Sequence, residues 1–178
     1  LKARGITVQV FESAAQVRPL GVGINVQPSA IVELAALGLL PQLDALGVRT
    51  AEVCYFNRHG QRIWSEPRGL AAGYRVPQFS IHRGELQMLL MQTALQRLGP
   101  QAVSCGQEAV AVDPDSASVT LLDRDSGQTR VERADAVISA DGIHSAVRDK
   151  LYPDEGPPIW NGRILWRGVT ESEAFLSG

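Results

Sequence analysis

Two acidic residues at the ends of apolar segments are the first side chains in this sequence that could bind a ligand. Glu12 closes the segment 5–12, and Asp141 follows the apolar segment 134–140 and precedes Gly142. A carboxylate at the carboxyl end of a buried parallel strand lies where open α/β sheets bind their ligands. On the residues alone, either acid could instead close an ordinary strand or cap the next helix.

The surroundings of Glu12 are typical of the second half of a dinucleotide-binding βαβ unit. Residues 1–4 are expected to end a helix that Gly5 caps, and the strand that follows would end at Glu12. In such units the acid binds a ribose hydroxyl, and a glycine-rich phosphate turn lies about 20 residues earlier. We therefore expect that turn to lie upstream of Leu1.

Arg83 is a candidate anion-binding residue at the start of a predicted helix. Apolar residues recur at helical spacing after it until Gly99 ends the helix. The positive end of a helix dipole disfavours a cation, so an anion held jointly by Arg83 and the helix amides is one explanation. A solvated or ion-paired arginine is the other. The loop at 18–28 carries two glycines, including Gly23, that would let its backbone lie against a flat ligand.

The elements that would position these residues are a mixture of helices and short strands. The spacing of apolar and turn residues predicts two helices, from Pro28 to Gly38 and from Pro41 to Leu46. It predicts a hairpin over 50–64, an extended segment at 79–82 and an antiparallel meander between 102 and 131. It also predicts a central strand buried on both faces at 134–140, and a strand at 164–169 that begins a second sheet.

Composition excludes several classes of function. The 178 residues carry 17 basic and 19 acidic side chains, a net charge of -2 that gives no reason to expect nucleic-acid binding. No apolar run approaches the roughly 20 residues of a membrane span. The two cysteines and three histidines are too dispersed to form a metal site. These features predict a cytoplasmic protein without a metal.

Taken in order, these segments resemble the flavin-dependent aromatic hydroxylases, the single-component monooxygenases that include the hydroxybenzoate hydroxylases. Further stretches at 18–25, 64–69, 80–90 and 166–171 are similar to family members that modify phenazines. The resemblance to the family as a whole rests on Val10-Phe11-Glu12, Gly21 to Ile24 with Pro28, Arg83 with Leu86 and Leu90, and the segment from Asp141 to Arg148.

The resemblance implies an α/β fold with a Rossmann-like FAD-binding domain at 1–155 and the start of a substrate-binding domain at 156–178. It implies an enzyme that binds FAD, uses NADPH or NADH, and hydroxylates a small aromatic substrate with molecular oxygen through a flavin hydroperoxide. No residue of the chain would then be catalytic, because the cofactor carries the chemistry. The implied roles are ribose for Glu12, the flavin edge for Gly23, pyrophosphate for Arg83, pyrophosphate and ribityl groups for Asp141 and Gly142, NAD(P)H for His144 and Arg148, and substrate for Arg167. On a helix that starts near Ile143, His144 and Arg148 would be four residues apart and would share a face, which could equally be an ordinary polar outer face.

Three departures from the family accompany this resemblance. The glycine-rich turn and the later Gly-Asp flavin motif both fall outside the chain, so these residues are expected to be inactive by themselves. Gly21 stands where hydroxybenzoate hydroxylases carry an arginine beside the flavin. A flavoprotein reductase or halogenase of the same fold, an inactive flavin-binding fragment, and a homodimer all stay open as alternatives.

Overall fold

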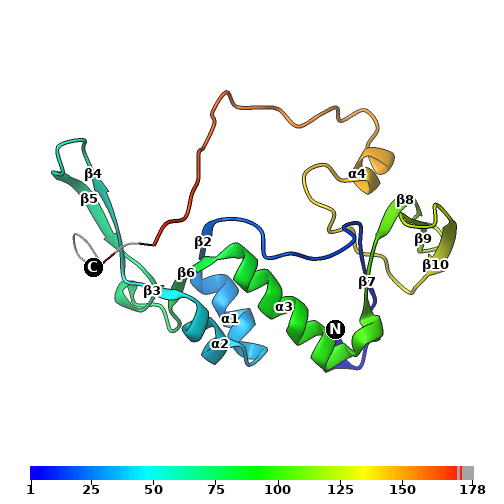
Figure 1. Ribbon diagram of the computed structural model, residues 1–178, viewed down its shortest axis with the longest axis horizontal. Helices are drawn as coiled ribbons and strands as arrows, with labels where there is room; N and C mark the ends of the chain where they lie inside the picture. Colours follow the sequence, from blue (N-terminus) through cyan, green and yellow to red (C-terminus); the bar gives the residue numbers. More distant parts are fainter. Residues whose placement is uncertain (172, 174–178) are drawn as a thin grey trace. The chain divides into compact units, whose positions relative to one another are not determined.

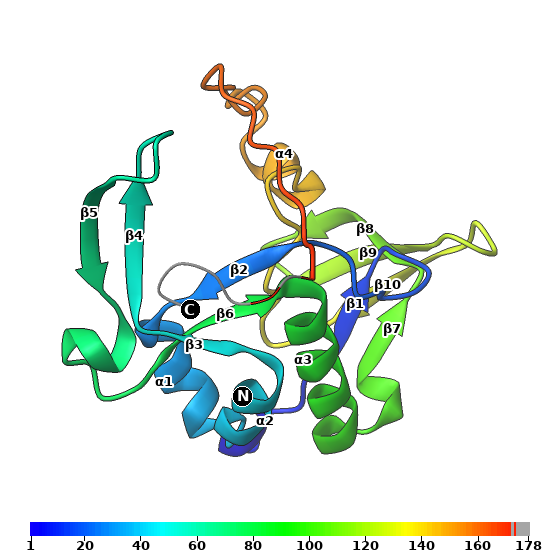
Figure 2. The ribbon, with the colours of Figure 1, turned by 60° about the vertical axis from the view of Figure 1, so that its left-hand side comes forward.

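Two short strands that are far apart in the sequence form the parallel pair expected of a dinucleotide-binding fold. β1 (Val10–Glu12) runs parallel to β7 (Val103–Cys105), with Val10 opposite Val103 and Glu12 opposite Cys105. β7 is labelled in Figure 1, and Figure 2 labels both strands. Helices accompany these strands along the chain, so the predicted α/β class is confirmed.

The computed structural model describes residues 1–171 and 173, which group into two compact units. Unit 1 comprises residues 1–17 and 92–165. Unit 2 comprises residues 18–91 and the described residues from Trp166 onward. The predicted domain boundary at residue 155 stays a prediction, and each unit is considered by itself below.

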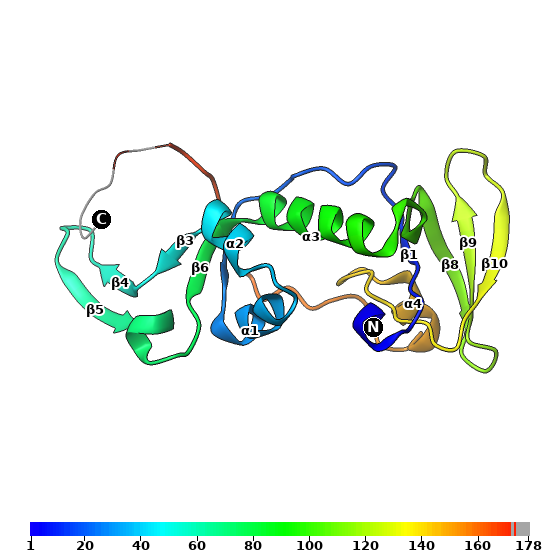
Figure 3. The same cartoon turned by 90° about the horizontal axis from the view of Figure 1, so that it is seen from below.

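Unit 1 contains the predicted meander as a three-stranded antiparallel sheet in the order β10-β9-β8 (Figure 3). Leu121 of β9 is buried, as is Val147 of the helix that packs against β8. The elements are the 3-10 helices η1 (Lys2–Arg4) and η3 (Pro100–Ala102), the strands β8 (Gln107–Asp113), β9 (Ser118–Asp123) and β10 (Thr129–Arg133), and α4 (Ala146–Leu151).

Unit 2 is built on an antiparallel sheet in the order β2-β6-β3, and Figure 2 shows α1 and α2 on one side of it. Its strands are β2 (Gly23–Val26), β3 (Val48–Thr50) and β6 (Gln78–His82), and its helices are α1 (Pro28–Ala36) and α2 (Leu40–Leu46). The core contains Val26, Ile31, Leu43, Phe79 and Ile81.

The two faces of this sheet differ in polarity. Successive residues of a strand point to opposite faces, and along β6 the buried apolar residues Phe79 and Ile81 alternate with Gln78, Ser80 and His82. The apolar side chains pack against the helices. The other face of the sheet therefore presents polar side chains.

A hairpin and the first part of a long helix complete unit 2. β4 (Glu52–Phe56) and β5 (Arg62–Pro67) pair as the sequence predicts, and the 3-10 helix η2 (Gly69–Ala72) follows. α3 (Arg83–Leu98) begins directly after β6, so the prediction that Arg83 opens a helix is confirmed.

Two predicted strands are absent. Residues 134–140 form no strand, and Ile138 is 75% exposed where the sequence predicts burial on both faces. A parallel strand needs a hydrogen-bonded neighbour, and among the described residues the β1–β7 pair has no third strand. The predicted strand at 164–169 is likewise extended without a partner. Both predictions are wrong for the same physical reason.

Within the part of the chain that the structure describes, no helix has the length and apolar character needed to cross a bilayer. Over the same residues, no cluster of three or more His, Cys, Asp or Glu side chains could hold a metal ion.

Candidate functional site

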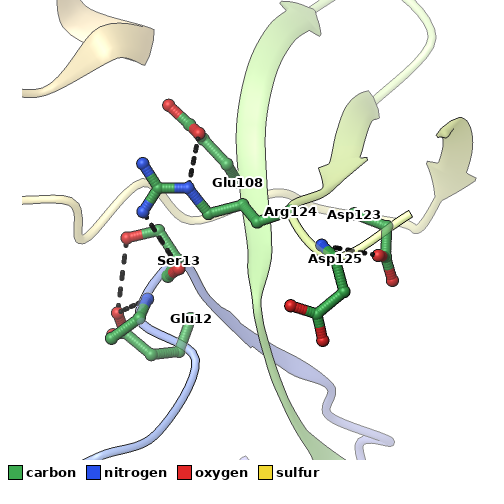
Figure 4. A network of polar contacts seen from close by, with 7 residues as sticks. Glu12, Ser13, Glu108, Asp123, Arg124 and Asp125 are labelled. Atoms are coloured by element: carbon green, nitrogen blue, oxygen red, sulfur yellow. Dashed lines mark hydrogen bonds and ion pairs between the residues drawn. The ribbon is translucent and has the colours of Figure 1, made fainter. Parts of the chain in front are cut away.

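The turn after β1 holds Glu12 with one carboxylate oxygen occupied and the other available. The backbone N–H of Ala14 donates to Oε1 of Glu12 at 2.7 Å, and the Ser13 hydroxyl lies 3.4 Å from the same oxygen (Figure 4). Among the described residues, nothing donates to Oε2. An acceptor oxygen at the end of a parallel strand is suited to a ribose hydroxyl.

Arg124 fixes this turn from a distant part of unit 1, and the sequence gives no indication of it. Its Nη1 donates to the carbonyl of Ser13 at 3.3 Å, and its Nε pairs with Glu108 at 3.1 Å. Figure 4 shows the guanidinium reaching both groups. The turn is also tied to the rest of the unit by the N–H of Gly106, which donates to Ala14 at 2.9 Å.

The turn that carries Arg124 is itself stabilised by Asp123. The N–H groups of Ser126 and Asp125 donate to this carboxylate, and Nε2 of Gln107 donates to it at 2.8 Å. Figure 4 shows the bond from Asp125. The backbone bond from Ser126 is the largest cause that lowers the pKa of Asp123, to about 2. The Asp123 carboxylate is therefore charged at neutral pH, and its hydrogen bonds stabilise the turn.

In unit 2, the loop before β2 lies directly on the start of α3. The N–H of Arg83 donates to the carbonyl of Val22 at 3.0 Å, and its Nη2 lies 3.5 Å from the carbonyl of Leu20. Gly21 has φ +127, and a Cβ on it would lie 2.6 Å from Nε of Arg83. Among the described residues, no carboxylate pairs with Arg83, so its exposed guanidinium is free to bind an anion.

Gly84 makes this approach of loop and helix feasible. A Cβ at Gly84 would lie 2.4 Å from the carbonyl carbon of Pro19, which is closer than any real contact allows. The backbone of Pro19 therefore occupies the space of a side chain on α3. We did not predict this role for Gly84, although a glycine in the first turn of a helix is a signal of close backbone approach.

His82 also holds the loop. Its Nε2 lies 3.0 Å from the carbonyl of Gly21, which requires that Nε2 carry the proton. Its Nδ1 is buried and has no hydrogen-bond partner among the described residues. The loop backbone from Leu20 to Val22 is thus attached both to the last residue of β6, His82, and to the first residue of α3, Arg83.

Asp141 is engaged by its own segment. Ser145 donates to Oδ1 at 2.6 Å, Ser139 donates to the same oxygen, and the N–H of Val147 lies 3.3 Å from Oδ2. Partial burial raises the pKa of Asp141, but these hydrogen bonds outweigh it and lower the pKa to about 2. Both carboxylate oxygens of Asp141 accept hydrogen bonds from its own segment, so Asp141 stabilises this turn. This supports the expectation that any contact of Asp141 with a ligand is indirect.

The segment after Asp141 differs from its predicted geometry. α4 begins at Ala146 with Ser145 as its cap, whereas the sequence predicts a helix starting near Ile143. The argument that His144 and Arg148 share a helix face is therefore wrong, because His144 precedes the cap. The prediction did not take into account the Ser145 hydroxyl, which accepts a hydrogen bond from the N–H of Arg148 at 2.9 Å and so caps α4.

Gly142 and Arg148 lie in different environments. Gly142 has φ +82 and open space around its Cβ position, so its backbone is accessible to a ligand. The guanidinium of Arg148 is paired with Glu155, which raises the pKa of Arg148 through a side-chain hydrogen bond. Arg148 is therefore not a free cation. Its predicted role in NAD(P)H binding requires exchange of this partner.

Arg167 lies at an open depression of about 520 Å³ in unit 2. Its side chain is exposed, and among the described residues it pairs with no carboxylate. Gly23 lies in the same lining, so the structure brings together one predicted flavin-loop residue and the predicted substrate residue. The other lining residues are Ile24, Asn25 and Ser80.

The FAD-binding domain family matches residues 1–157. The chain belongs to this family. The chain is 46% identical over its whole length to phenazine 1,6-dicarboxylic acid hydroxylase PhzS from Lysobacter antibioticus, of which it covers 45%. It is also 28% identical to a salicylate hydroxylase from Pseudomonas putida, over 94% of the chain and 38% of that protein. The chain therefore spans less than half the length of these relatives.

Two solved structures, one of them determined with FAD, are similar to this chain. 2-Methyl-3-hydroxypyridine-5-carboxylic acid oxygenase superposes with a TM-score of 0.69 at 28% identity, over 85% of this chain and 37% of that one. Klebsiella pneumoniae HpxO, solved with FAD and uric acid, superposes with a TM-score of 0.63 at 26% identity, over 84% of this chain and 36% of that one.

Each unit contains a side chain that is chemically suited to one part of FAD. In unit 2, the loop backbone packs closely on the start of α3 at Gly21 and Gly84. Among the described residues, no carboxylate pairs with the Arg83 guanidinium, so this cation is available to a diphosphate. In unit 1, Glu12 offers a free acceptor oxygen to a ribose. These features are chemically appropriate to the pyrophosphate and adenosine parts of the cofactor.

Proposed function

We propose that the full-length protein is an FAD-dependent monooxygenase that uses NAD(P)H and molecular oxygen to hydroxylate an aromatic substrate, most specifically a phenazine carboxylate. The observation that carries the proposal is the packing of the Gly21 loop on Arg83, which combines an accessible cation with a backbone surface for a planar ring. The aromatic class is supported by the names of the relatives, and the phenazine by the relative with 46% identity.

In this proposal, each residue contributes to binding and orientation. Glu12 would accept a hydrogen bond from the adenosine ribose, and Arg83 would bind the pyrophosphate through charge-assisted hydrogen bonds. Gly23 leaves room for the flavin edge. Asp141 keeps the following turn in shape, so that the backbone of Gly142 approaches the cofactor.

Two further cations complete the proposed roles. Arg148, with His144 beside the start of α4, would contact NAD(P)H after release from Glu155. Arg167 would meet the substrate. Bound FAD supplies the redox chemistry, and the chain supplies no nucleophile, which is why no catalytic residue is assigned. We further propose that the enzyme works in the cytoplasm, where NAD(P)H is available.

The test is oxygen uptake by the purified full-length protein, with its flavin content measured from the absorbance spectrum. We expect bound FAD and NAD(P)H-dependent oxygen consumption that a phenazine carboxylate stimulates. The product should carry one added oxygen by mass, with or without loss of a carboxylate. NAD(P)H consumption with no oxygen in the product, or a halogenated product, would contradict the proposal.

A further inference from the structure

A chain of hydrogen bonds crosses the polar face of the unit 2 sheet. Asn25 of β2 lies opposite Ser80 of β6, and the Ser80 hydroxyl donates to Oδ1 of Asn25 at 2.7 Å. Thr50 of β3 lies 2.8 Å from Ser80, oxygen to oxygen. The three side chains therefore link all three strands of the sheet on the face away from α1 and α2.

The direction of these hydrogen bonds is fixed by simple counting. A serine hydroxyl carries one hydrogen, and that of Ser80 is donated to Asn25. Thr50 must therefore donate to Ser80. Because Oδ1 of Asn25 is the acceptor at the end of the chain, the amide is held in one orientation, with its Nδ2 group on the other side.

The Nδ2 group of Asn25 and the Arg167 guanidinium are both unused donors. Among the described residues, neither has a hydrogen-bond acceptor or an ion-pair partner, and both residues line the same depression of about 520 Å³. Oδ1 of Asn25 and the Ser80 hydroxyl oxygen each already accept a hydrogen bond within this chain of hydrogen bonds. The depression therefore offers one fixed neutral donor and one cation.

We infer that Asn25 is a specificity-determining residue which, with Arg167, binds the carboxylate of an aromatic acid substrate. This inference rests on the proposed function and adds to it a second residue, Asn25, that contacts the carboxylate of the substrate. A carboxylate is acceptor-only and accepts charge-assisted hydrogen bonds from both groups. A substrate that bears a donor or a cation at this position would leave Asn25 without a partner. Because the depression is open, solvent screens the charge of Arg167. Asn25 and Arg167 therefore contribute more to the choice among substrates than to binding affinity.

The experiment compares two ligands in the FAD-loaded, full-length protein. Phenazine-1,6-dicarboxylate and unsubstituted phenazine are titrated, and each Kd is taken from the change in flavin absorbance. The key variant is Asn25→Asp, which keeps the bond from Ser80 but replaces the donor by an anionic oxygen. We expect its Kd for the dicarboxylate to rise at least tenfold, while its Kd for phenazine changes less than twofold.

Two other variants calibrate this result. Ser80→Ala releases the amide of Asn25 to rotate and should raise the Kd for the dicarboxylate about threefold. Thr50→Val removes a hydroxyl from the same face but leaves the Ser80–Asn25 bond, so both Kd values should stay within twofold of the wild type. If Asn25→Asp fails to retain FAD, the contrast between Ser80→Ala and Thr50→Val decides the question.

The outcomes separate the two proposals. A wild-type protein that prefers the dicarboxylate, with an Asn25→Asp variant that keeps the same preference, would refute the role of Asn25 and leave the proposed function intact. A wild-type protein that holds FAD but responds to neither ligand would refute the proposed substrate class and this inference together.

Discussion

Gly21 and Arg83 are packed so closely that a Cβ on Gly21 would lie 2.6 Å from Nε of Arg83. The guanidinium can move away from such an atom, because it is the end of a flexible side chain. The backbone cannot relax as easily, because Gly21 has φ +127, which other residues rarely adopt. The glycine thus determines where the arginine points.

Replacing Gly21 by alanine should therefore affect cofactor binding more than folding. In the full-length protein, we expect Gly21→Ala to raise the Kd for FAD at least tenfold, with a stability loss of about 1 to 3 kcal/mol from backbone strain. Gly38→Ala is the matched control, since Gly38 has φ +74 and open space at its Cβ position. It should lose stability but keep FAD affinity within twofold, as measured by flavin fluorescence titration.

Gly84→Ala should have a different effect, because the clash there is with backbone. The added atom would lie 2.4 Å from Pro19, so the loop has to leave the helix. We expect both a lower melting temperature and loss of bound FAD. Gly73→Ala, at a glycine with φ +85 and no atom within 4 Å, controls for the glycine replacement. Full flavin occupancy in Gly84→Ala would show that the loop does not contact the cofactor.

Glu12→Ala should weaken FAD binding by about 1 to 3 kcal/mol, the usual size of a lost hydrogen bond to a charged acceptor. Arg83→Ala should weaken it at least as much. The control is Glu33→Ala, which removes an exposed carboxylate from α1. Retention of flavin by both variants during dialysis, at the wild-type level, would show that the ribose and pyrophosphate assignments are wrong.

The acid dependence of stability should report on Asp141. Its pKa falls from an ordinary 3.8 to about 2 in the folded protein, so its carboxylate stabilises the fold fully above pH 4. This contribution is lost as the pH falls toward 2. The difference in unfolding free energy between wild type and Asp141→Asn should therefore be constant near neutrality and shrink between pH 4 and 2. Denaturant titrations at several pH values measure it, and a difference independent of pH would contradict the assignment.

The pairing of Arg148 with Glu155 gives a prediction for the reductant. If Arg148 binds NAD(P)H, Glu155→Gln should lower the KM for NAD(P)H because it releases the guanidinium. Arg148→Gln should raise the KM, and neither change should alter FAD content. Asp149→Asn, on the same helix, is the control for a lost negative charge. An unchanged KM in both variants would remove Arg148 from the NAD(P)H site.

The elements that the sequence predicts correctly are those with local signals. Pro28 opens α1, Gly38 with φ +74 follows its end, and the periodic leucines after Arg83 mark α3. Such signals depend on residues a few positions apart. The turn at residues 57–60, between β4 and β5, is of the same kind.

The errors concern features that depend on distant partners. Residues 134–140 have a strand-like composition, but a strand also needs a neighbour, which composition does not specify. The contacts of Gly84 with Pro19 and of Arg124 with Ser13 join parts of the chain that no local signal relates. The site residues Glu12 and Arg83 were identifiable because each ends or begins an element, whereas the residues that hold them were not.

The pairing of β1 with β7 also bears on how the chain acquires its structure. Val10 pairs with Val103, so the chain between them must close into a long loop before the two strands can meet. This loop includes residues 18–91 of unit 2. Loop closure over such a distance is slow and costs entropy. Unit 2, whose contacts lie mostly within one continuous stretch, can form while unit 1 is still open. We therefore expect the start of α3, which carries Arg83, to be protected from hydrogen exchange earlier in refolding than the turn that carries Glu12. The proposed anion-binding residue would then become ordered before the proposed ribose-binding residue.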